Sequence, residues 1–141
     1  MKSFSKIEFP VRSTDLDVNA HVNNAKFLEY LEWGREDWFE QRGFKYDELK
    51  EQNLITVLAR MEVDYRREAR QNDTMTVYTW LSAVGRSSMQ MEQKILNQYG
   101  EMITEAKATV VTVSAKERRP IAVPDEIRKH IALESPALVI N

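Results

Sequence analysis

Residues 24–42 carry the sequence NAKFLEYLEWGREDWFEQR, in which apolar side chains recur at helical spacing. The repeat consists of Phe27, Leu31, Gly34 and Trp38 at positions i, i+4, i+7 and i+11, and it is widened by Leu28, Trp33 and Phe39. This spacing predicts one long α-helix with a broad apolar face. Because such a face needs cover from other elements, we expect the helix to be largely buried.

The ends of this helix and the glycine inside it are also marked in the sequence. Asn23 or Asn24 is a suitable N-cap, and Gly43 stands where a left-handed residue ends a helix. Gly34 costs the helix about 1 kcal/mol against alanine. A close approach of the helix backbone to a sheet would explain that cost, and an accidental glycine is the alternative.

The segments around the helix have the patterns of strands. Phe4–Arg12 is predicted as a strand, and Pro10 favours an edge or a bulge there. After the helix the apolar period changes to two, which predicts a strand with one core face made of Ile55, Val57, Ala59, Met61, Val63 and Tyr65. Three further strands are predicted at Thr74–Val84, Ser87–Asn97 and Met102–Ser114, with joints short enough for hairpins.

The order of these elements predicts an α+β protein. We expect the four later strands to form a meander, so that an antiparallel sheet of about five strands wraps around the central helix. A short helix is predicted from Pro124 to Leu133, with proline at its first position and acids in its first turn. The sequence shows no repeat or linker, so we expect a single domain over residues 1–141.

The composition excludes several classes of function. The chain has 141 residues, is 43% hydrophobic and has a net charge of −2, which gives no electrostatic footprint for nucleic acid. It has no cysteine, which excludes thiolate nucleophiles and disulfides, and only two histidines far apart, so we expect no metal site. There is no secretory signal and no apolar run near the ~20 residues of a membrane span. We therefore expect a cytoplasmic protein without a membrane partner.

A dense polar cluster, DLDVNAHVNN at residues 15–24, stands directly before the long helix. The start of a helix presents unpaired N–H groups and a positive potential, which are the donors needed to polarise a carbonyl group. A carboxylate beside them can attack the carbonyl carbon or activate a water molecule. With no cysteine and no serine in a nucleophile elbow, a carboxylate is the strongest candidate. On spacing alone, a loop that merely caps the helix remains the simpler interpretation.

Residues 15–27, DLDVNAHVNNAKF, resemble the signature loop of the hotdog-fold acyl thioesterases, in the versions of the 4-hydroxybenzoyl-CoA thioesterase-like enzymes and of the plant acyl-ACP thioesterases. Residues 63–69, VDYRREA, resemble the strand-end motif of the same families. The resemblance implies a hotdog fold and hydrolysis of an acyl thioester of coenzyme A or acyl carrier protein (ACP). It implies no cofactor beyond the carrier that is part of the substrate.

The resemblance also assigns roles to single residues. Asp17 matches the essential carboxylate, a nucleophile or general base, and the amide of Asn24 matches the group that hydrogen-bonds the thioester carbonyl. Asn19, His21 and Glu68 match polar residues implicated in the acyl-ACP type. Because the hydroxybenzoyl enzymes lack this His and Asn, a fatty-acyl substrate is favoured. Asp15 is interpreted as structural.

Substrate binding and assembly are predicted less directly. Arg86, Arg118 and Arg119 are candidates for binding the phosphates of coenzyme A. The plant enzymes hold two hotdog domains in one chain, so with a single domain here we expect a homodimer or homotetramer, in which exposed sheet edges pair. The alternatives are a non-catalytic domain that senses acyl-CoA and a hotdog dehydratase, whose Asp–His arrangement inside the helix is absent from the sequence.

Overall fold

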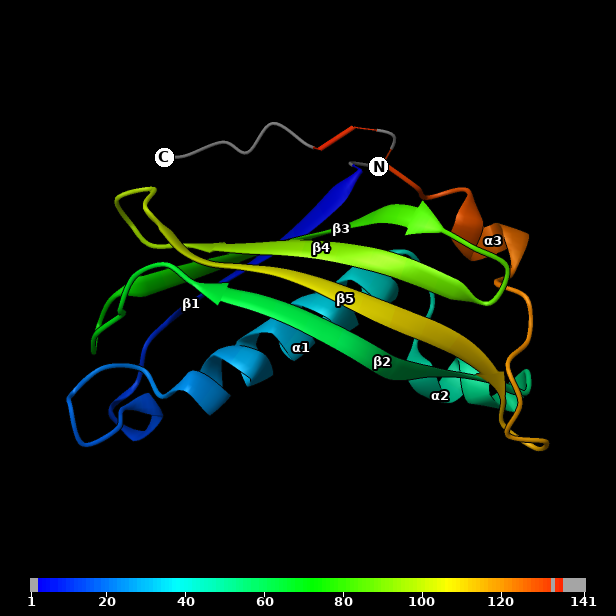
Figure 1. The fold of residues 1–141 in the computed structure, drawn as a ribbon, viewed down its shortest axis with the longest axis horizontal. Helices are drawn as coiled ribbons and strands as arrows, with labels where there is room; N and C mark the ends of the chain where they lie inside the picture. The colour runs from blue at the N-terminus through cyan, green and yellow to red at the C-terminus, as the bar shows by residue number, and fades with distance from the viewer. Residues whose placement is uncertain (1–2, 133, 136–141) are drawn as a thin grey trace.

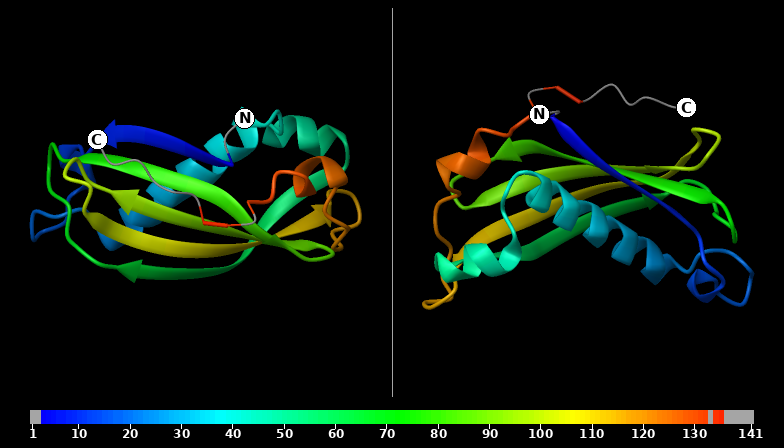
Figure 2. Two further views of the ribbon diagram at one scale, coloured as in Figure 1. Left: turned by 90° about the horizontal axis from the view of Figure 1, so that it is seen from above. Right: turned by 180° about the vertical axis from the view of Figure 1, so that it is seen from behind.

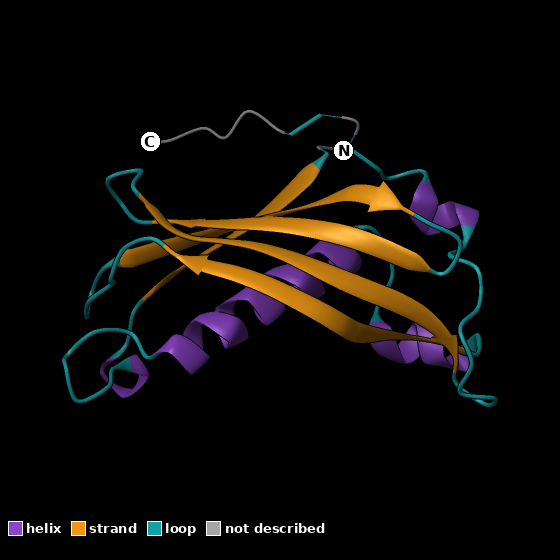
Figure 3. Cartoon of the chain, viewed as in Figure 1, coloured by secondary structure: helices purple, strands orange, loops and turns teal. Residues whose placement is uncertain are grey.

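The computed structural model of the chain describes residues 3–132 and 134–135. Its elements in chain order are β1 (Phe4–Pro10), the short 3₁₀ turn η1 (Ser13–Asp15), α1 (Asn24–Gln41), α2 (Tyr46–Glu51), β2 (Leu54–Tyr65), β3 (Thr74–Val84), β4 (Ser88–Leu96), β5 (Met102–Ser114) and α3 (Asp125–Arg128). The strands form one antiparallel sheet, and α1 lies along one face of it (Figures 1 and 3). Figure 2 shows the sheet curving around α1, so the predicted α+β architecture is confirmed.

The order of strands in the sheet is β1-β3-β4-β5-β2. The predicted meander is therefore correct for β3, β4 and β5 and wrong for β2, which pairs with β5 from Leu54↔Ser114 to Tyr65↔Thr104. The reason is the connection at residues 66–73, which crosses the end of the sheet instead of turning back as a hairpin: Arg66 N–H donates to Ile103 O at 2.8 Å, and Asn72 N–H donates to Val11 O at 3.0 Å. As a result, β1 and β2 are the two outer strands.

The ends of α1 follow the predicted signals. The side chain of Asn23 accepts a hydrogen bond from Ala25 N–H at 2.8 Å, so Asn23 is the N-cap. Gly43, just beyond the helix, has φ of +85°, the left-handed conformation that glycine adopts without steric cost. The helix therefore begins at Asn24, and its first N–H groups face the polar loop that precedes it.

Gly34 marks the place where α1 comes closest to the sheet. A Cβ atom at this position would lie 2.7 Å from Val77 Cγ1, 2.8 Å from Thr79 Oγ1 and 2.9 Å from Gln93 Nε2. These distances leave no room for a side chain. The predicted close approach of helix and sheet is therefore confirmed.

Most of the predicted apolar stripe of α1 is buried. Phe27, Leu31, Trp38 and Phe39 are at most 3% exposed. The inclusion of Leu28 and Trp33 was wrong, since they are 42% and 41% exposed. α1 packs against β1, β3 and β4. Leu28 lies outside the arc that the sheet covers, and Trp33 lies at its border, where its ring contacts that of Phe9 on β1 at 5.3 Å between centroids. The face is narrower than the sequence suggested.

The predicted single core face of β2 is also wrong in its first half. The register against β5 shifts between Leu58 and Arg60, which leaves Ala59 as the extra residue of a bulge. Because a bulge reverses the alternation of side chains, Met61 and Val63 pack on the core, whereas Val57 is 45% exposed. As an outer strand, β2 has a neighbouring strand on only one of its two edges in the described part of the chain.

Two helical segments differ from the sequence prediction. α2, which packs against β2, was not predicted, because its six residues are too few for a clear apolar repeat. α3 spans only Asp125–Arg128, with Pro124 as N-cap and not at the first helical position. Leu133, the predicted end of this helix, lies outside the described residues. No helix in the described ranges is long and apolar enough to cross a membrane.

Candidate active site

The polar loop before α1 is held at both of its ends by backbone hydrogen bonds. Leu16 and Val22 form an isolated antiparallel bridge. Val22 N–H donates to Ala69 O at 2.8 Å, which ties the loop to the segment after β2. Asn23 N–H donates to Asp15 O at 2.9 Å, which ties it to the start of the helix. The tip of the loop, residues 17–21, therefore has a defined place beside the first turn of α1.

Asp17 is fixed at this tip by its own backbone and by its neighbours. Its N–H donates to His21 O at 2.9 Å, and its carbonyl accepts from Ala20 N–H at 3.0 Å. The turn requires φ of +63° at Ala20, an uncommon value for a residue other than glycine. Asp17 Oδ1 accepts a hydrogen bond from Asn19 N–H at 2.9 Å, which leaves Oδ2 available for other partners.

Asp15 has a structural place, as its sequence context suggested. It is 7% exposed, and its Oδ2 accepts hydrogen bonds from Tyr30 Oη at 2.7 Å and from Arg12 N–H at 3.0 Å. Burial alone would raise the pKa of Asp15, but these hydrogen bonds and the nearby charge of Lys26 outweigh it and hold the pKa below its usual value. Asp15 therefore remains ionised and anchors the loop to α1.

The first turn of α1 leaves one donor free. Ala25 N–H donates to the Asn23 side chain, and Lys26 N–H and Phe27 N–H donate to Asn23 O. Within the described part of the chain, Asn24 N–H donates to no group. At the positive end of an 18-residue helix, this N–H can bind a carbonyl oxygen or a developing oxyanion.

His21 and Glu68 meet across the loop and the segment after β2. His21 Nε2 lies 2.9 Å from Glu68 Oε2, and the two side chains are 36% and 46% exposed. Glu68 also accepts from Arg70 Nη2 at 2.7 Å. The hydrogen bond from Arg70, and then the charge of His21, hold the pKa of Glu68 below its usual value. Glu68 is thus an ionised partner for a protonated His21 or for an N–H on its ring.

These groups face one cavity. A pocket of about 270 Å³ is lined by Asp17, His21, Asn24 and Glu68, together with Val22, Phe27, Tyr65, Arg66 and Arg67. Four of the five predicted catalytic residues therefore surround the same space, although they come from the loop, the helix and the segment after β2. The combination of a carboxylate, a free amide and a His–Glu pair has the chemistry for attack on an activated carbonyl group.

Not every predicted residue lies in this pocket. Asn19 does not line it, and the contact it makes with Asp17 is through its backbone N–H. Arg86 follows β3, whereas Arg118 and Arg119 follow β5, and these turns lie at the opposite end of the sheet from the loop (Figure 1). Within one chain the structure does not bring these arginines to the pocket, so only a second chain could place them there.

Two arginines that the sequence interpretation passed over do line the pocket. Arg66 pairs with Glu105 at 3.0 Å and Arg67 with Glu101 at 3.2 Å. The signal was present, because both stand directly before Glu68 in the strand-end motif. No group of three or more His, Asp or Glu side chains suited to a metal ion occurs in residues 3–132 and 134–135.

Comparison with known proteins agrees with the fold and the loop. Residues 11–131 match the family described as the thioesterase-like superfamily. The chain is 30% identical to the long-chain acyl-CoA thioesterase FadM of Escherichia coli K12 over 125 residues, covering 88% of this chain and 94% of FadM. It is 28% identical to the acyl-acyl carrier protein thioesterase ATL3 of Arabidopsis thaliana, covering 91% of this chain and 67% of ATL3.

A solved structure gives the same result in three dimensions. The probable thioesterase YbaW of Escherichia coli superposes with a TM-score of 0.79 at 30% identity, covering 89% of this chain and 94% of YbaW. The expected hotdog fold is therefore confirmed. The family match, the relatives and the shared fold together show that this chain is an enzyme of the thioesterase-like superfamily.

Proposed function

We propose that this enzyme hydrolyses a fatty-acyl thioester of coenzyme A or ACP, with Asp17 as nucleophile or general base. The observation that carries the proposal is that Asp17 and the free N–H of Asn24 line the same pocket. One group can attack or activate water while the other binds the oxygen on which negative charge develops. The names of FadM and ATL3 support acyl-CoA and acyl-ACP as the substrate classes.

Two routes are compatible with this placement. In the first, a carboxylate oxygen of Asp17 attacks the thioester carbon, the C–S bond breaks, and water then hydrolyses the mixed anhydride to the free acid. In the second, Asp17 takes a proton from a water molecule whose oxygen attacks the same carbon. In both routes the carbonyl oxygen accepts a hydrogen bond from Asn24 N–H, and the thiolate leaves and is protonated.

The other pocket residues have supporting roles in the proposal. Asn19 N–H fixes one oxygen of Asp17, so the second oxygen faces the reacting carbon or the water. Glu68 orients His21, which in turn orients the attacking water. In the proposal, Arg66 and Arg67, which line the pocket, bind the phosphates of the carrier. A binding role for Arg86, Arg118 and Arg119 remains a prediction that requires a second copy of the chain.

Assembly is the second part of the proposal. β2 is a 12-residue outer strand, and it carries the exposed side chains of Val57 and Leu58. We infer that this edge pairs with a second copy, because an unpaired apolar edge favours association. Light scattering should show at least a homodimer, and Val57→Asp should shift it toward monomer. A monomeric wild-type chain would contradict this part.

The proposed chemistry is tested by Asp17→Asn. Thiol release from palmitoyl-CoA, followed with a thiol-reactive dye, should fall by about 10²–10⁴-fold, the range of general acid–base catalysis. The melting temperature should stay close to that of the wild type, because Asp17 lies at the tip of a surface loop. Thiol release near the wild-type rate would remove Asp17 from the mechanism.

The same assay addresses the remaining alternatives. A wild-type chain that binds acyl-CoA and releases no thiol would be a sensor and not a hydrolase. A panel of acyl chain lengths on both carriers then identifies the preferred chain length and carrier.

A further inference from the structure

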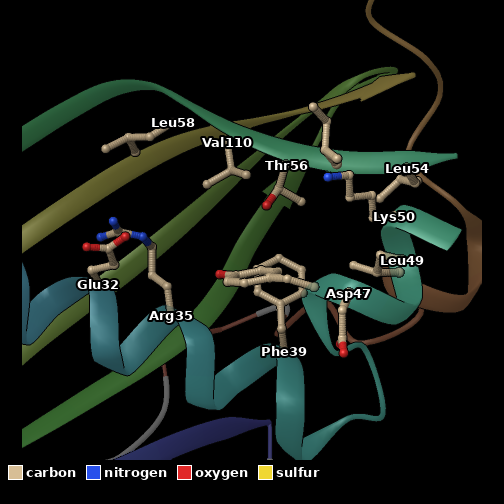
Figure 4. Close-up of a pocket in the computed structure, with 12 residues that line it drawn as sticks. Glu32, Arg35, Phe39, Asp47, Leu49, Lys50, Leu54, Thr56, Leu58 and Val110 are labelled. Carbon is tan, nitrogen blue, oxygen red and sulfur yellow. The ribbon is translucent and has the colours of Figure 1, made fainter. Parts of the chain in front are cut away.

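A second and larger pocket lies further along α1. It has a volume of about 360 Å³ and is enclosed by α1, α2 and the first half of β2 (Figure 4). Arg35 and Phe39 extend into it from α1, and Thr56, Leu58 and Val110 face them from the strands (Figure 4). Half of the side chains that line it are apolar, which provides a surface that an alkyl chain can contact.

Arg35 is the buried charged residue among those that line this pocket. It is 8% exposed, although it carries a full positive charge. Its Nη1 donates to Gln93 Oε1 at 3.1 Å and lies 3.9 Å from Met61 Sδ. Among the described residues, no carboxylate lies within ion-pair distance of Arg35, and its Nε and Nη2 have no hydrogen-bond partner.

A network of hydrogen bonds through Gln93 holds the guanidinium group of Arg35 in this position. Gln93 Nε2 donates to Leu31 O at 2.8 Å and to Thr79 Oγ1 at 2.9 Å, which fixes the amide oxygen that Arg35 contacts. Gln93 accepts a hydrogen bond only from Nη1 of Arg35. The N–H groups on Nε and Nη2 can therefore donate to other acceptors. Because Arg35 lines the pocket, these donors can bind water there or an acceptor atom of a ligand.

The other charged groups around the pocket do not replace such a partner. Glu32, Asp47 and Lys50 line it and are exposed, so water and salt weaken their fields. Tyr46 also lines it, and burial, together with the nearby Glu36, raises the pKa of its hydroxyl to about 12, so it stays neutral. Arg35 is the buried charge in this set, and the charges of Glu32 and Glu36 act on it.

The two pockets lie along the same pair of elements. The first is flanked by Phe27 on α1 and Tyr65 at the end of β2, and the second by Arg35 on α1 and Leu58 on β2. With a rise of 1.5 Å per residue, Arg35 lies about 16 Å along the helix from Asn24. By its length, an extended long acyl chain whose carbonyl is held by Asn24 N–H can span the distance to Arg35.

We propose that Arg35 binds an oxygen atom at the far end of the acyl group. The preferred substrates are then acyl thioesters whose chain carries a hydroxyl, oxo or carboxylate group at the end remote from sulfur. This inference rests on the proposed function, because it takes Asn24 N–H as the point where the thioester is held. It adds a specificity-determining residue outside the catalytic pocket.

The test compares dodecanoyl-CoA with its 12-hydroxy and ω-carboxy analogues. Wild-type kcat/KM should be higher for the oxygenated substrates by about tenfold, the size of one hydrogen bond to a charged group. Arg35→Met should bring the ratio close to one while dodecanoyl-CoA is still hydrolysed. Arg35→Lys, which keeps the charge, should retain part of the preference for the carboxylate.

Arg42→Met is the matched control. Arg42, just after the end of α1, is also buried, and its Nη1 donates to Ser5 Oγ and to Trp38 O. Arg42 is not among the residues that line the pocket. This change should lower the melting temperature without altering the substrate ratio. If Arg35→Met fails to fold, the wild-type ratio and the Arg35→Lys ratio still decide the question.

Other outcomes would overturn the proposal. Equal kcat/KM for the three substrates in the wild type would do so, and so would a ratio that persists in Arg35→Met. Inhibition by free dodecanoate that is relieved in Arg35→Met, without any substrate preference, would mark the pocket as a fatty-acid site instead. Loss of all thiol release in the wild type would contradict the proposed function itself, which separates the two failures.

Discussion

The first turn of α1 and the middle of α1 differ in their packing and in their hydrogen bonding. At the first turn, Asn24 is exposed, its N–H has no partner within the described residues, and a pocket lies beside it. In the middle, Gly34 leaves no space for even one methyl group, and Gln93 beside it makes hydrogen bonds through both its nitrogen and its oxygen.

This difference separates reactivity from stability along one helix. A free donor at the helix start costs little, because water can satisfy it until a substrate arrives. An unsatisfied group or a misplaced atom in the middle would cost stability at once, because nothing there can move away or be hydrated. Changes in the first turn should therefore act on rate, whereas changes in the middle should act on folding.

The largest effect is expected from Asn24→Pro. Asn24 is the first helical residue, where proline is well tolerated, and Asn23 already has the extended backbone (φ −63°, ψ +141°) that precedes proline. The substitution removes the N–H that we assign to the carbonyl oxygen. kcat should fall by about 10²–10³-fold, the loss typical of one oxyanion donor, while the melting temperature changes little.

Asn24→Ala is the matched control, since it removes the side chain and keeps the N–H. It should retain most of the activity. If proline and alanine have the same effect on kcat, the Asn24 amide has no role in catalysis. The claim that the first turn of α1 acts on the reaction rate would then be contradicted.

The second-largest effect is expected from Gly34→Ala, which should lower the free energy of unfolding. The new Cβ would meet three side-chain atoms at less than 3.0 Å. Overpacking of this kind costs about 1–3 kcal/mol, which exceeds the gain of about 1 kcal/mol in helix propensity. Urea unfolding measures the loss, and Glu40→Ala on the exposed face of α1 should show none. A variant more stable than the wild type would mean that the sheet yields at this point.

These two positions also show what the sequence could predict. The start of the helix and Gly34 were identified from local signals, a cap motif and a glycine in an apolar stripe, whereas the role of the Asn24 amide came from the resemblance of the loop. The bounds of β3 and β5 were correct for the same reason, since alternation and flanking glycines are local features. The loop motif placed Asp17 and His21 beside the helix start, and the structure puts both on one pocket with Asn24.

The features that were missed depend on contacts distant in sequence. The pairing of β2 with β5 cannot be read from β2, because both of its possible neighbours have strand patterns. The bulge at Ala59 reverses the faces of the strand without any glycine to mark it. Tyr30 and Arg35 look like solvent-facing residues, and their burial follows only from Asp15 and Gln93, which supply partners from elsewhere in the chain.

A third, smaller effect is expected from Tyr30→Phe, which cuts the link between the loop and the helix. The variant loses the 2.7 Å hydrogen bond to Asp15 and should be less stable by about 1.5 kcal/mol at pH 7, since the acceptor is charged. The lowered pKa of Asp15 gives stability that is present above the unfolded-state pKa near 3.9 and is lost as the pH falls through the folded-state value.

The loss in Tyr30→Phe should therefore begin to shrink below about pH 4. It should vanish only below the lowered folded-state pKa of Asp15, where the carboxyl group is protonated in the folded protein as well. Urea unfolding at pH 7 and pH 3 tests this, with Tyr99→Phe, a tyrosine 74% exposed, as the control. A loss that is independent of pH would assign the effect to packing and not to the charge of Asp15.

The smallest effect is a shift of the pH profile in Arg70→Met. Arg70 is the main cause of the lowered pKa of Glu68, so its removal should let that pKa rise. If ionised Glu68 holds His21 for catalysis, the acidic limb of kcat/KM should move to higher pH while the rate at pH 8 is unchanged. Arg60→Met, which removes an exposed arginine that pairs with Glu62 at 2.8 Å, serves as the control. A limb that stays in place in Arg70→Met would show that Glu68 orients nothing during the reaction, and it would leave Asp17 and the amide of Asn24 as the groups that act on the thioester.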